Sequence, residues 1–279
     1  MKYFNFHTHT LYCDGKSSPE EFILTAIDKN MSAIGFSSHS PLPFKNTYSI
    51  KADRVEEYKN EVRELQKKYA DKINIFLALE FDYVPGLSDN FNVLKNRLGL
   101  DYSIGSVHLV KNIKSDELWF IDGPETNYAK GLLSVFNNDI KLAVKSFFEQ
   151  TAQMAIIEKP TIIGHFDKVK MHNRNRFFKE TESWYIKLVK QTLNVVAKSG
   201  SIIEVNTRGV YKKRCESLYP GEEILSEILK LKIPITISAD AHEIHELTLY
   251  YPETISILKD IGFKKVKYFT GKSWDDCNI

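Results

Sequence analysis

The chain has 279 residues, 43% hydrophobic and 27% charged, which is the composition of an ordinary globular protein. Its formal net charge is +2 and it has no Lys/Arg block, so we expect no nucleic-acid partner. The three cysteines are widely spaced, which argues against a zinc finger or a disulfide framework. We expect a cytoplasmic protein, because the N-terminus lacks a signal-peptide pattern and no apolar run is long enough to span a membrane.

Short apolar runs alternate with longer amphipathic segments along the chain. The predicted strands are 3–7, 33–37, 73–81, 102–108, 161–165, 201–206 and 235–238, each rich in β-branched or aromatic residues. The predicted helices begin near Pro19, Ala52, Ser88, Asp139, Glu182, Pro220 and Pro252. Segment 111–127 has neither pattern, and we interpret it as an active-site loop.

Repeated strand-then-helix units predict an α/β fold with a parallel sheet. Seven or eight such units favour a closed barrel over an open sheet. The sequence has no internal repeat, no low-complexity stretch and no linker that would divide it. We therefore expect residues 1–279 to form a single domain.

Histidines gather at the predicted strand ends. Five of the eight end a strand or follow one directly, namely His7, His9, His39, His108 and His165. Because the loops of parallel α/β folds converge at the carboxyl ends of the strands, these side chains should share one rim. Histidines that served only to fill a core would have no reason to keep to that rim.

Three carboxylates and one further histidine extend this set. Glu80 lies inside an apolar strand, where an unpaired carboxylate is costly and needs a cation or hydrogen-bond donors. Asp14 lies in a turn sequence, while Asp240 and His242 follow the last predicted strand in an alternating pattern. The remaining histidines, His172 and His245, are not at strand ends, and we interpret them as loop residues.

The candidate metal ligands number nine: His7, His9, Asp14, His39, Glu80, His108, His165, Asp240 and His242. A single catalytic zinc ion needs about three protein ligands and keeps one position open for water. Nine ligands with one bridging carboxylate would suit three divalent ions. Imidazole and carboxylate together accept zinc, iron or manganese, and the sequence does not choose among them.

The ordered ligand set resembles that of the polymerase-and-histidinol-phosphatase (PHP) superfamily of metallophosphoesterases, through nearly the whole chain. The resemblance implies a distorted (β/α)7 TIM-like barrel with a trinuclear metal site at the carboxyl ends of the strands. It assigns the first metal to His7, His9, Glu80 and Asp240, the second to Glu80, His108 and His165, and the third to Asp14, His39 and His242. Many members of the superfamily carry His at the position of Asp14, which leaves the affinity and identity of the third metal open.

Within the superfamily, the chain is most similar to monofunctional histidinol-phosphate phosphatases. Its length suits a stand-alone enzyme, and segments 36–43 and 204–209 are similar to two strand motifs of that group. The resemblance implies hydrolysis of L-histidinol phosphate, a step of histidine biosynthesis, by a metal-activated water. Arg208, in the second motif, would bind the phosphate.

Other substrate contacts and the proton donor are less determined by the sequence. Arg174 or Arg176 could supply a second phosphate clamp, or could belong to an exposed basic loop. Asp240, His242 or a metal-bound water could protonate the leaving group. Residues of the 111–127 segment, Trp119, Asp122 and Glu125, could meet the imidazole and amine of the substrate.

Three other functions remain open. The same scaffold could act on a nucleotide, an oligonucleotide or a phosphotyrosine, although the near-zero net charge disfavours a nuclease. A non-catalytic metal-binding protein is disfavoured by the full ligand set. A metal-dependent amidohydrolase would need a Lys at a strand end in mid-barrel, and none stands in a convincing position.

Overall fold

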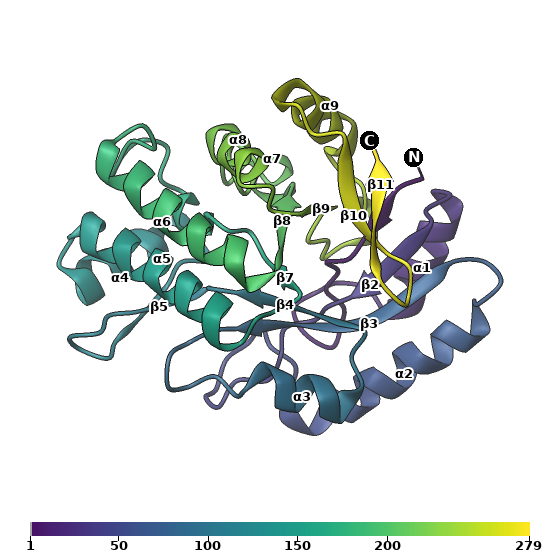
Figure 1. Ribbon diagram of the computed structural model, residues 1–279. Helices are drawn as coiled ribbons and strands as arrows, with labels where there is room; N and C mark the ends of the chain where they lie inside the picture. The colour runs from purple at the N-terminus through teal and green to yellow at the C-terminus, as the bar shows by residue number, and fades with distance from the viewer. Residues whose placement is uncertain (1) are drawn as a thin grey trace.

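The computed structural model describes residues 2–279, which form a ring of parallel strands surrounded by helices (Figure 1). The seven strands of the main sheet lie in the order β1-β2-β3-β4-β7-β8-β9, and every neighbouring pair is parallel. Their bounds are Phe4–Asn5, Ala33–Phe36, Asn74–Asp82, Tyr102–Ser106, Ile162–Ile163, Ile202–Asn206 and Ile235–Ser238. The prediction of seven parallel strands is confirmed.

The ring is closed between its first and last strands. Just beyond β1 and β9, Thr8 and Ala241 form a parallel bridge, in which the His9 N–H donates to the Ala241 carbonyl at 2.8 Å. The Ala241 N–H in turn donates to the His7 carbonyl at 3.0 Å. The sheet is therefore a distorted seven-stranded α/β barrel, as the sequence predicts.

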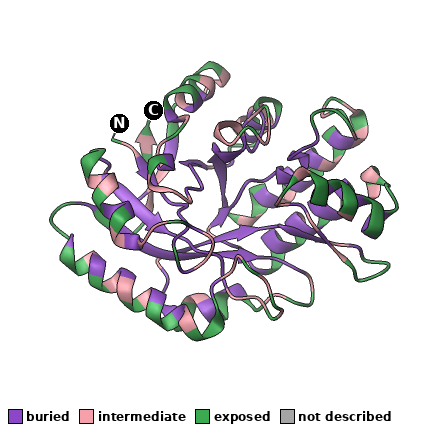
Figure 2. Ribbon diagram, turned by 180° about the vertical axis from the view of Figure 1, so that it is seen from behind, coloured by how far each residue is buried: buried purple, intermediate pink, exposed green. Residues whose placement is uncertain are grey.

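The helices lie outside the ring with one face turned to it, so buried and exposed residues alternate along them, while the strands of the main sheet are buried apart from Asn74 (Figure 2). Their bounds are α1 Pro19–Asp28, α2 Val55–Lys68, α3 Phe91–Leu98, α4 Glu125–Phe136, α5 Ile140–Ile157, α6 Ser183–Ser199, α7 Arg208–Tyr211, α8 Glu222–Lys230 and α9 Tyr251–Ile261. Helix α1 begins with a capping box between Ser18 and Glu21 and with Pro19 in its first turn. No helix among residues 2–279 combines the length and the apolar character that crossing a bilayer requires.

The interpretation of segment 111–127 as an irregular loop is wrong in part. Strands β5 (Leu109–Lys111) and β6 (Leu118–Phe120) form an antiparallel hairpin, and α4 begins at Glu125. Each strand has only three residues, too few for alternation to stand out in the sequence. The hairpin nevertheless returns to the barrel rim, because the Ile121 N–H donates to the His108 carbonyl at 2.9 Å.

A second hairpin, not anticipated from the sequence, closes the opposite end of the barrel. It consists of β10 (Lys265–Phe269) and β11 (Trp274–Asn278). We call this end, where the strands begin, the barrel base, and the end where they finish the barrel rim. Aromatic rings from the hairpin and the strand starts pack together at the base: Phe4, Phe6, Phe76, Tyr102, Phe269 and Trp274.

Candidate metal centre

All nine candidate ligands lie at the barrel rim. Each stands near the end of a strand or in the residues after it, so six of the seven strands contribute to one small volume. Seven of the nine are buried, while Asp14 and His242 are half-buried at the opening. The structure therefore brings together the side chains that the sequence singles out.

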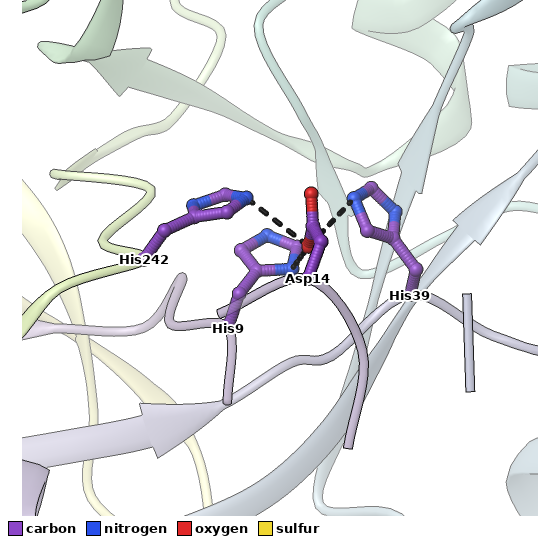
Figure 3. A group of neighbouring side chains, drawn as sticks. All are labelled: His9, Asp14, His39 and His242. Atoms are coloured by element: carbon purple, nitrogen blue, oxygen red, sulfur yellow. Dashed lines mark ion pairs between the residues drawn. The ribbon is translucent and has the colours of Figure 1, made fainter. Parts of the chain in front are cut away.

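The first group consists of His9, Asp14, His39 and His242, and their side chains converge in Figure 3. The carboxylate of Asp14 lies in the middle. Its Oδ1 is 3.3 Å from His242 Nε2, 3.7 Å from His9 Nδ1 and 3.9 Å from His39 Nε2. These separations leave room for a cation shared among the four side chains.

The second group, His7, His9 and Asp240, lies deeper in the barrel. Asp240 Oδ1 is 3.2 Å from His9 Nε2 and 3.7 Å from His7 Nε2. His7 and His9 are two residues apart, and their rings tilt toward the same point with centroids 5.0 Å apart. The period-two spacing thus aims both imidazoles at one volume, as expected beside an extended strand end.

Glu80 stands between the groups and faces both ways. Its Oε2 lies 3.2 Å from His7 Nε2 and 3.1 Å from His39 Nδ1. Its Oε1 lies 3.0 Å from His165 Nε2 and 3.6 Å from His108 Nε2. The two oxygens of one carboxylate are therefore shared between separate sets of imidazoles, which is the geometry that a bridging ligand needs.

Several buried atoms at the centre have no hydrogen-bond partner among residues 2–279. These atoms are His7 Nε2, His9 Nε2, His39 Nδ1 and Asp14 Oδ1. A buried polar atom without a partner costs free energy, so a cluster of such atoms requires an explanation. Divalent cations fit this donor set of imidazole nitrogens and carboxylate oxygens, and they would satisfy all four atoms at once.

The electrostatics of the cluster favour ionised carboxylates. Burial alone would raise the pKa of the Glu80 carboxyl, but the charges of nearby histidines outweigh burial and hold this pKa well below its usual range. The pKa of the Asp240 carboxyl is lowered in the same way, against burial, with His7 and Arg208 as the main causes. The pKa of His9 is lowered by burial and by His242 and His39, so its ring is neutral and can offer a lone pair.

Two carboxylates that the sequence analysis did not assign contact candidate ligand rings at Nδ1, the ring nitrogen that faces away from the cluster. Glu204 Oε1 lies 2.6 Å from His7 Nδ1, and Asp82 Oδ1 lies 2.5 Å from His108 Nδ1. Histidines that bind metals commonly donate their other ring N–H to such a group. A signal was present for both, since each stands in a buried strand where an unpaired carboxylate would be costly.

A cavity of about 210 Å³ opens onto the centre. It is lined by the candidate ligands Asp14, His39, His108 and His242 and by two arginines, Arg208 and Arg214, which we call its cationic wall. The rings of Tyr48 and Phe120 also line it and stack on each other, with centroids 5.5 Å apart and planes inclined by 16°. The cavity is thus lined by candidate metal ligands, by two cations and by a pair of aromatic rings, and its volume suits a small phosphoester.

Arg208 is buried and firmly held at this wall. Its Nη1 donates to the Asp240 carbonyl at 2.8 Å, to the Tyr211 hydroxyl at 3.1 Å and to the Glu246 carboxylate at 3.2 Å. Burial would lower the pKa of the guanidinium, but Asp240, Tyr211 and Glu246 outweigh burial and raise the pKa. Arg208 is therefore a permanent cation beside the centre.

The structure places Arg174 and Arg176 outside the cavity, in the exposed basic loop that the sequence analysis gave as the alternative to a second clamp. The Arg174 guanidinium is exposed and donates to the Lys213 carbonyl at 2.9 Å. Arg176 pairs with Glu125 and donates to the His172 carbonyl. The second arginine at the cavity is Arg214, from a segment that the sequence analysis left unassigned.

The suggested contacts from segment 111–127 divide in a similar way. Asp122 lines the cavity, where its Oδ2 lies 2.6 Å from Lys168 Nζ and its Oδ1 accepts from Arg214 at 3.2 Å. Trp119 is fully buried, and its indole N–H donates to the Tyr128 carbonyl at 3.0 Å. Glu125 pairs with Arg176 and does not line the cavity, so among these suggestions only Asp122 is placed to meet a substrate.

The family described as PHP domain matches residues 5–208. The chain is 28% identical to the probable histidinol-phosphatase of Schizosaccharomyces pombe, over 92% of this chain and 86% of that protein. It is 26% identical to the histidinol-phosphatase of Bacillus subtilis, over 88% of this chain and 95% of that protein.

Solved structures show the same fold. The Listeria monocytogenes protein hisK superposes with a TM-score of 0.79 at 22% identity, covering 90% of this chain and 99% of that one. The histidinol phosphate phosphatase of Lactococcus lactis, solved with zinc, L-histidinol and phosphate, superposes with a TM-score of 0.69 at 20% identity. That superposition covers 98% of this chain and 99% of the Lactococcus protein.

Proposed function

Because the chain belongs to the PHP domain family, we propose that it is a metal-dependent phosphatase that hydrolyses L-histidinol phosphate to L-histidinol and phosphate. The observation that carries this proposal is the rim cluster, in which nine candidate ligand side chains meet beside a cavity lined by two arginines. Curated relatives that span most of the chain are named histidinol-phosphatases, which supports the choice of substrate. We place this step in histidine biosynthesis and in the cytoplasm, and we assign residues 1–279 to one domain.

We propose three divalent sites in the cluster. The first would use His7, His9, Glu80 and Asp240, the second Glu80, His108 and His165, and the third Asp14, His39 and His242. Zinc, iron or manganese would suit these ligands. Bound ions would supply Lewis-acid polarisation of the phosphate oxygens and would lower the pKa of a water molecule toward neutrality.

The side chains around the cluster have separate proposed roles. Arg208 and Arg214 would bind the phosphate oxygens and neutralise the charge that develops on them, as guanidinium forks do well. His242, which lines the cavity, would hold the proton that the leaving alkoxide takes up, because the lowered pKa of the Asp240 carboxyl keeps that carboxylate ionised. The stacked rings of Tyr48 and Phe120 would face the imidazole half of the substrate.

The test is release of phosphate from L-histidinol phosphate by protein purified without chelator and supplied with Mn²⁺ or Zn²⁺. p-Nitrophenyl phosphate, AMP, a phosphotyrosine peptide and single-stranded DNA serve as competing substrates. We expect a strong preference for histidinol phosphate that is lost on chelation and restored by metal. Turnover of another phosphoester alone would overturn the substrate, and turnover of none would favour a non-catalytic metal-binding protein.

A further inference from the structure

Glu204 is a fully buried carboxylate in β8 that contacts two candidate ligands from two other strands. Its Oε1 lies 2.6 Å from His7 Nδ1. Its Oε2 accepts from the His165 backbone N–H at 2.9 Å and from the Asn206 side-chain amide at 3.0 Å. Both oxygens are therefore engaged, and neither points at the cavity.

The contact with His7 decides which ring nitrogen is free. When Nδ1–H donates to Glu204, the lone pair stands on Nε2, which faces Glu80 Oε2 at 3.2 Å and Asp240 Oδ1 at 3.7 Å. His7 Nε2 is one of the buried atoms without a hydrogen-bond partner. The carboxylate thus fixes the tautomer and the orientation that a metal ligand needs.

The contact with His165 fixes a backbone rather than a ring. His165 has a φ of +24°, which a non-glycine residue adopts only when its surroundings hold it there. Its N–H is anchored on Glu204 while its Nε2 reaches Glu80 Oε1 at 3.0 Å. Glu204 therefore helps to hold the turn that points the His165 ring into the cluster.

Asp82 provides a contrast within the same cluster. It holds the ring of one candidate ligand, His108, through Oδ1 at 2.5 Å, while its Oδ2 lies 4.0 Å from His39 Nδ1, beyond hydrogen-bond distance. Glu204 instead joins His7 and His165, which belong to different proposed metal sites, through its two oxygens. Loss of the Asp82 carboxylate should affect one site, and loss of the Glu204 carboxylate should affect two.

We propose that Glu204 is a positioning residue that sets the metal affinity of two neighbouring sites at once, by orienting His7 and His165 together. This inference rests on the metal centre proposed above, but it does not depend on the substrate. Glu204 itself needs no contact with a metal ion or with the reacting atoms. Its effect should therefore be visible in metal binding before any substrate is added.

The decisive variant is Glu204→Gln. A glutamine has one acceptor oxygen, so its amide would face either the His7 Nδ1–H or the His165 N–H, donor against donor. We expect two of the Mn²⁺-binding steps to weaken by about 10- to 100-fold, the range typical of lost outer partners of metal ligands. Metal-free protein is titrated with Mn²⁺ against a competing chelator, and bound metal is counted directly.

Three further variants make the result specific. Glu158→Gln is the matched control, because Glu158 is a buried carboxylate that accepts a backbone N–H from Phe91 at 2.9 Å and contacts no candidate ligand. It should bind Mn²⁺ like the wild type. Asp82→Asn should weaken one step only. Glu204→Asp keeps the charge on a shorter side chain, and it is read by the same criteria if Glu204→Gln does not fold.

Activity supplies a second readout. In Glu204→Gln, kcat should recover as Mn²⁺ is raised to saturation, while KM for the phosphoester at saturating Mn²⁺ stays at the wild-type value. Wild-type affinity in a folded Glu204→Gln protein, or weakening of a single step, would overturn the proposal. If wild-type protein binds metal but does not turn over histidinol phosphate, the proposed substrate fails while the titration still decides the role of Glu204.

Discussion

The two ends of the barrel are built from the same strands and have opposite chemistry. At the rim, imidazoles and carboxylates are packed together with unpartnered polar atoms facing one another. At the base, aromatic rings pack edge to face or at a tilt, with Phe76 and Phe269 centroids 4.8 Å apart. Burial of unpartnered polar atoms at the rim costs free energy, which a bound cation would offset. The aromatic packing at the base is favourable without any ligand. Stability and function are therefore expected to separate along the barrel axis.

The largest effect should follow from Glu80→Gln at the rim. An amide cannot serve two sets of imidazoles as a bridging carboxylate would, so bound metal should fall and kcat/KM should drop by about 10³-fold or more, equivalent to about 4 kcal/mol. Metal counting and phosphate release measure the two losses. The control is Glu158→Gln, which removes a buried charge away from the rim. Full metal content with full activity in Glu80→Gln would remove Glu80 from the bridging position.

The base should respond in the opposite way. Phe269 is 6% exposed and packs on Phe76, Tyr102 and Trp274, so Phe269→Ala should lower the free energy of unfolding by about 3 kcal/mol. Metal content and kcat/KM at a temperature where the variant is folded should stay at wild-type values. Urea unfolding gives the first quantity. A folded variant that has lost its activity would show that the two ends are coupled.

Much of the barrel could be predicted from the sequence, because its strands are apolar, β-branched and separated by helices with clear starts. The pieces that could not be predicted are those whose structure depends on contacts distant in the chain. The β11 sequence Trp274–Asn278 is mostly polar and forms a strand because it pairs with β10, while Trp274 reaches the aromatic rings of the base. Strands β5 and β6 have three residues each and no pattern long enough to detect.

The convergence of the candidate ligands could be predicted because they stand near or beyond strand ends, and parallel strands end at one rim. The groups around them followed no such rule. Glu80 and Glu204 look alike in sequence, each a carboxylate inside an apolar strand, and only the fold shows that Glu80 faces the cluster while Glu204 stands behind His7. Arg214 reaches the cavity from a turn after α7, where no periodicity points to it, whereas Arg174 lies closer to His165 in sequence and remains outside.

Arg208→Ala tests the cationic wall of the rim. Removing a guanidinium that meets phosphate should raise KM and lower kcat together, with kcat/KM falling by about 10²-fold, or about 2.7 kcal/mol. Because Arg208 also donates to Tyr211, the matched control is Tyr211→Phe, which removes that hydrogen bond and keeps the cation. Steady-state kinetics at saturating metal compare the two. Wild-type kinetics in Arg208→Ala would exclude Arg208 from the phosphate site.

The smallest effect should come from Arg214→Ala, and it tests how far the rim extends toward solvent. The Arg214 side chain is 33% exposed and is paired with Asp122 at 3.2 Å. Solvent therefore partly screens its charge, and the Asp122 carboxylate partly neutralises it. We expect a fall of about tenfold in kcat/KM, or about 1.4 kcal/mol, with most of the change in KM. Arg174→Ala is the control, because that arginine is close in sequence to the rim but donates to the Lys213 carbonyl outside the cavity. Equal losses in both variants would mean that general surface charge, rather than a built phosphate wall, attracts the substrate. A loss of kcat/KM in Arg214→Ala alone would place Arg214 at the outer limit of the phosphate site, a position that follows from the tertiary structure and not from the sequence.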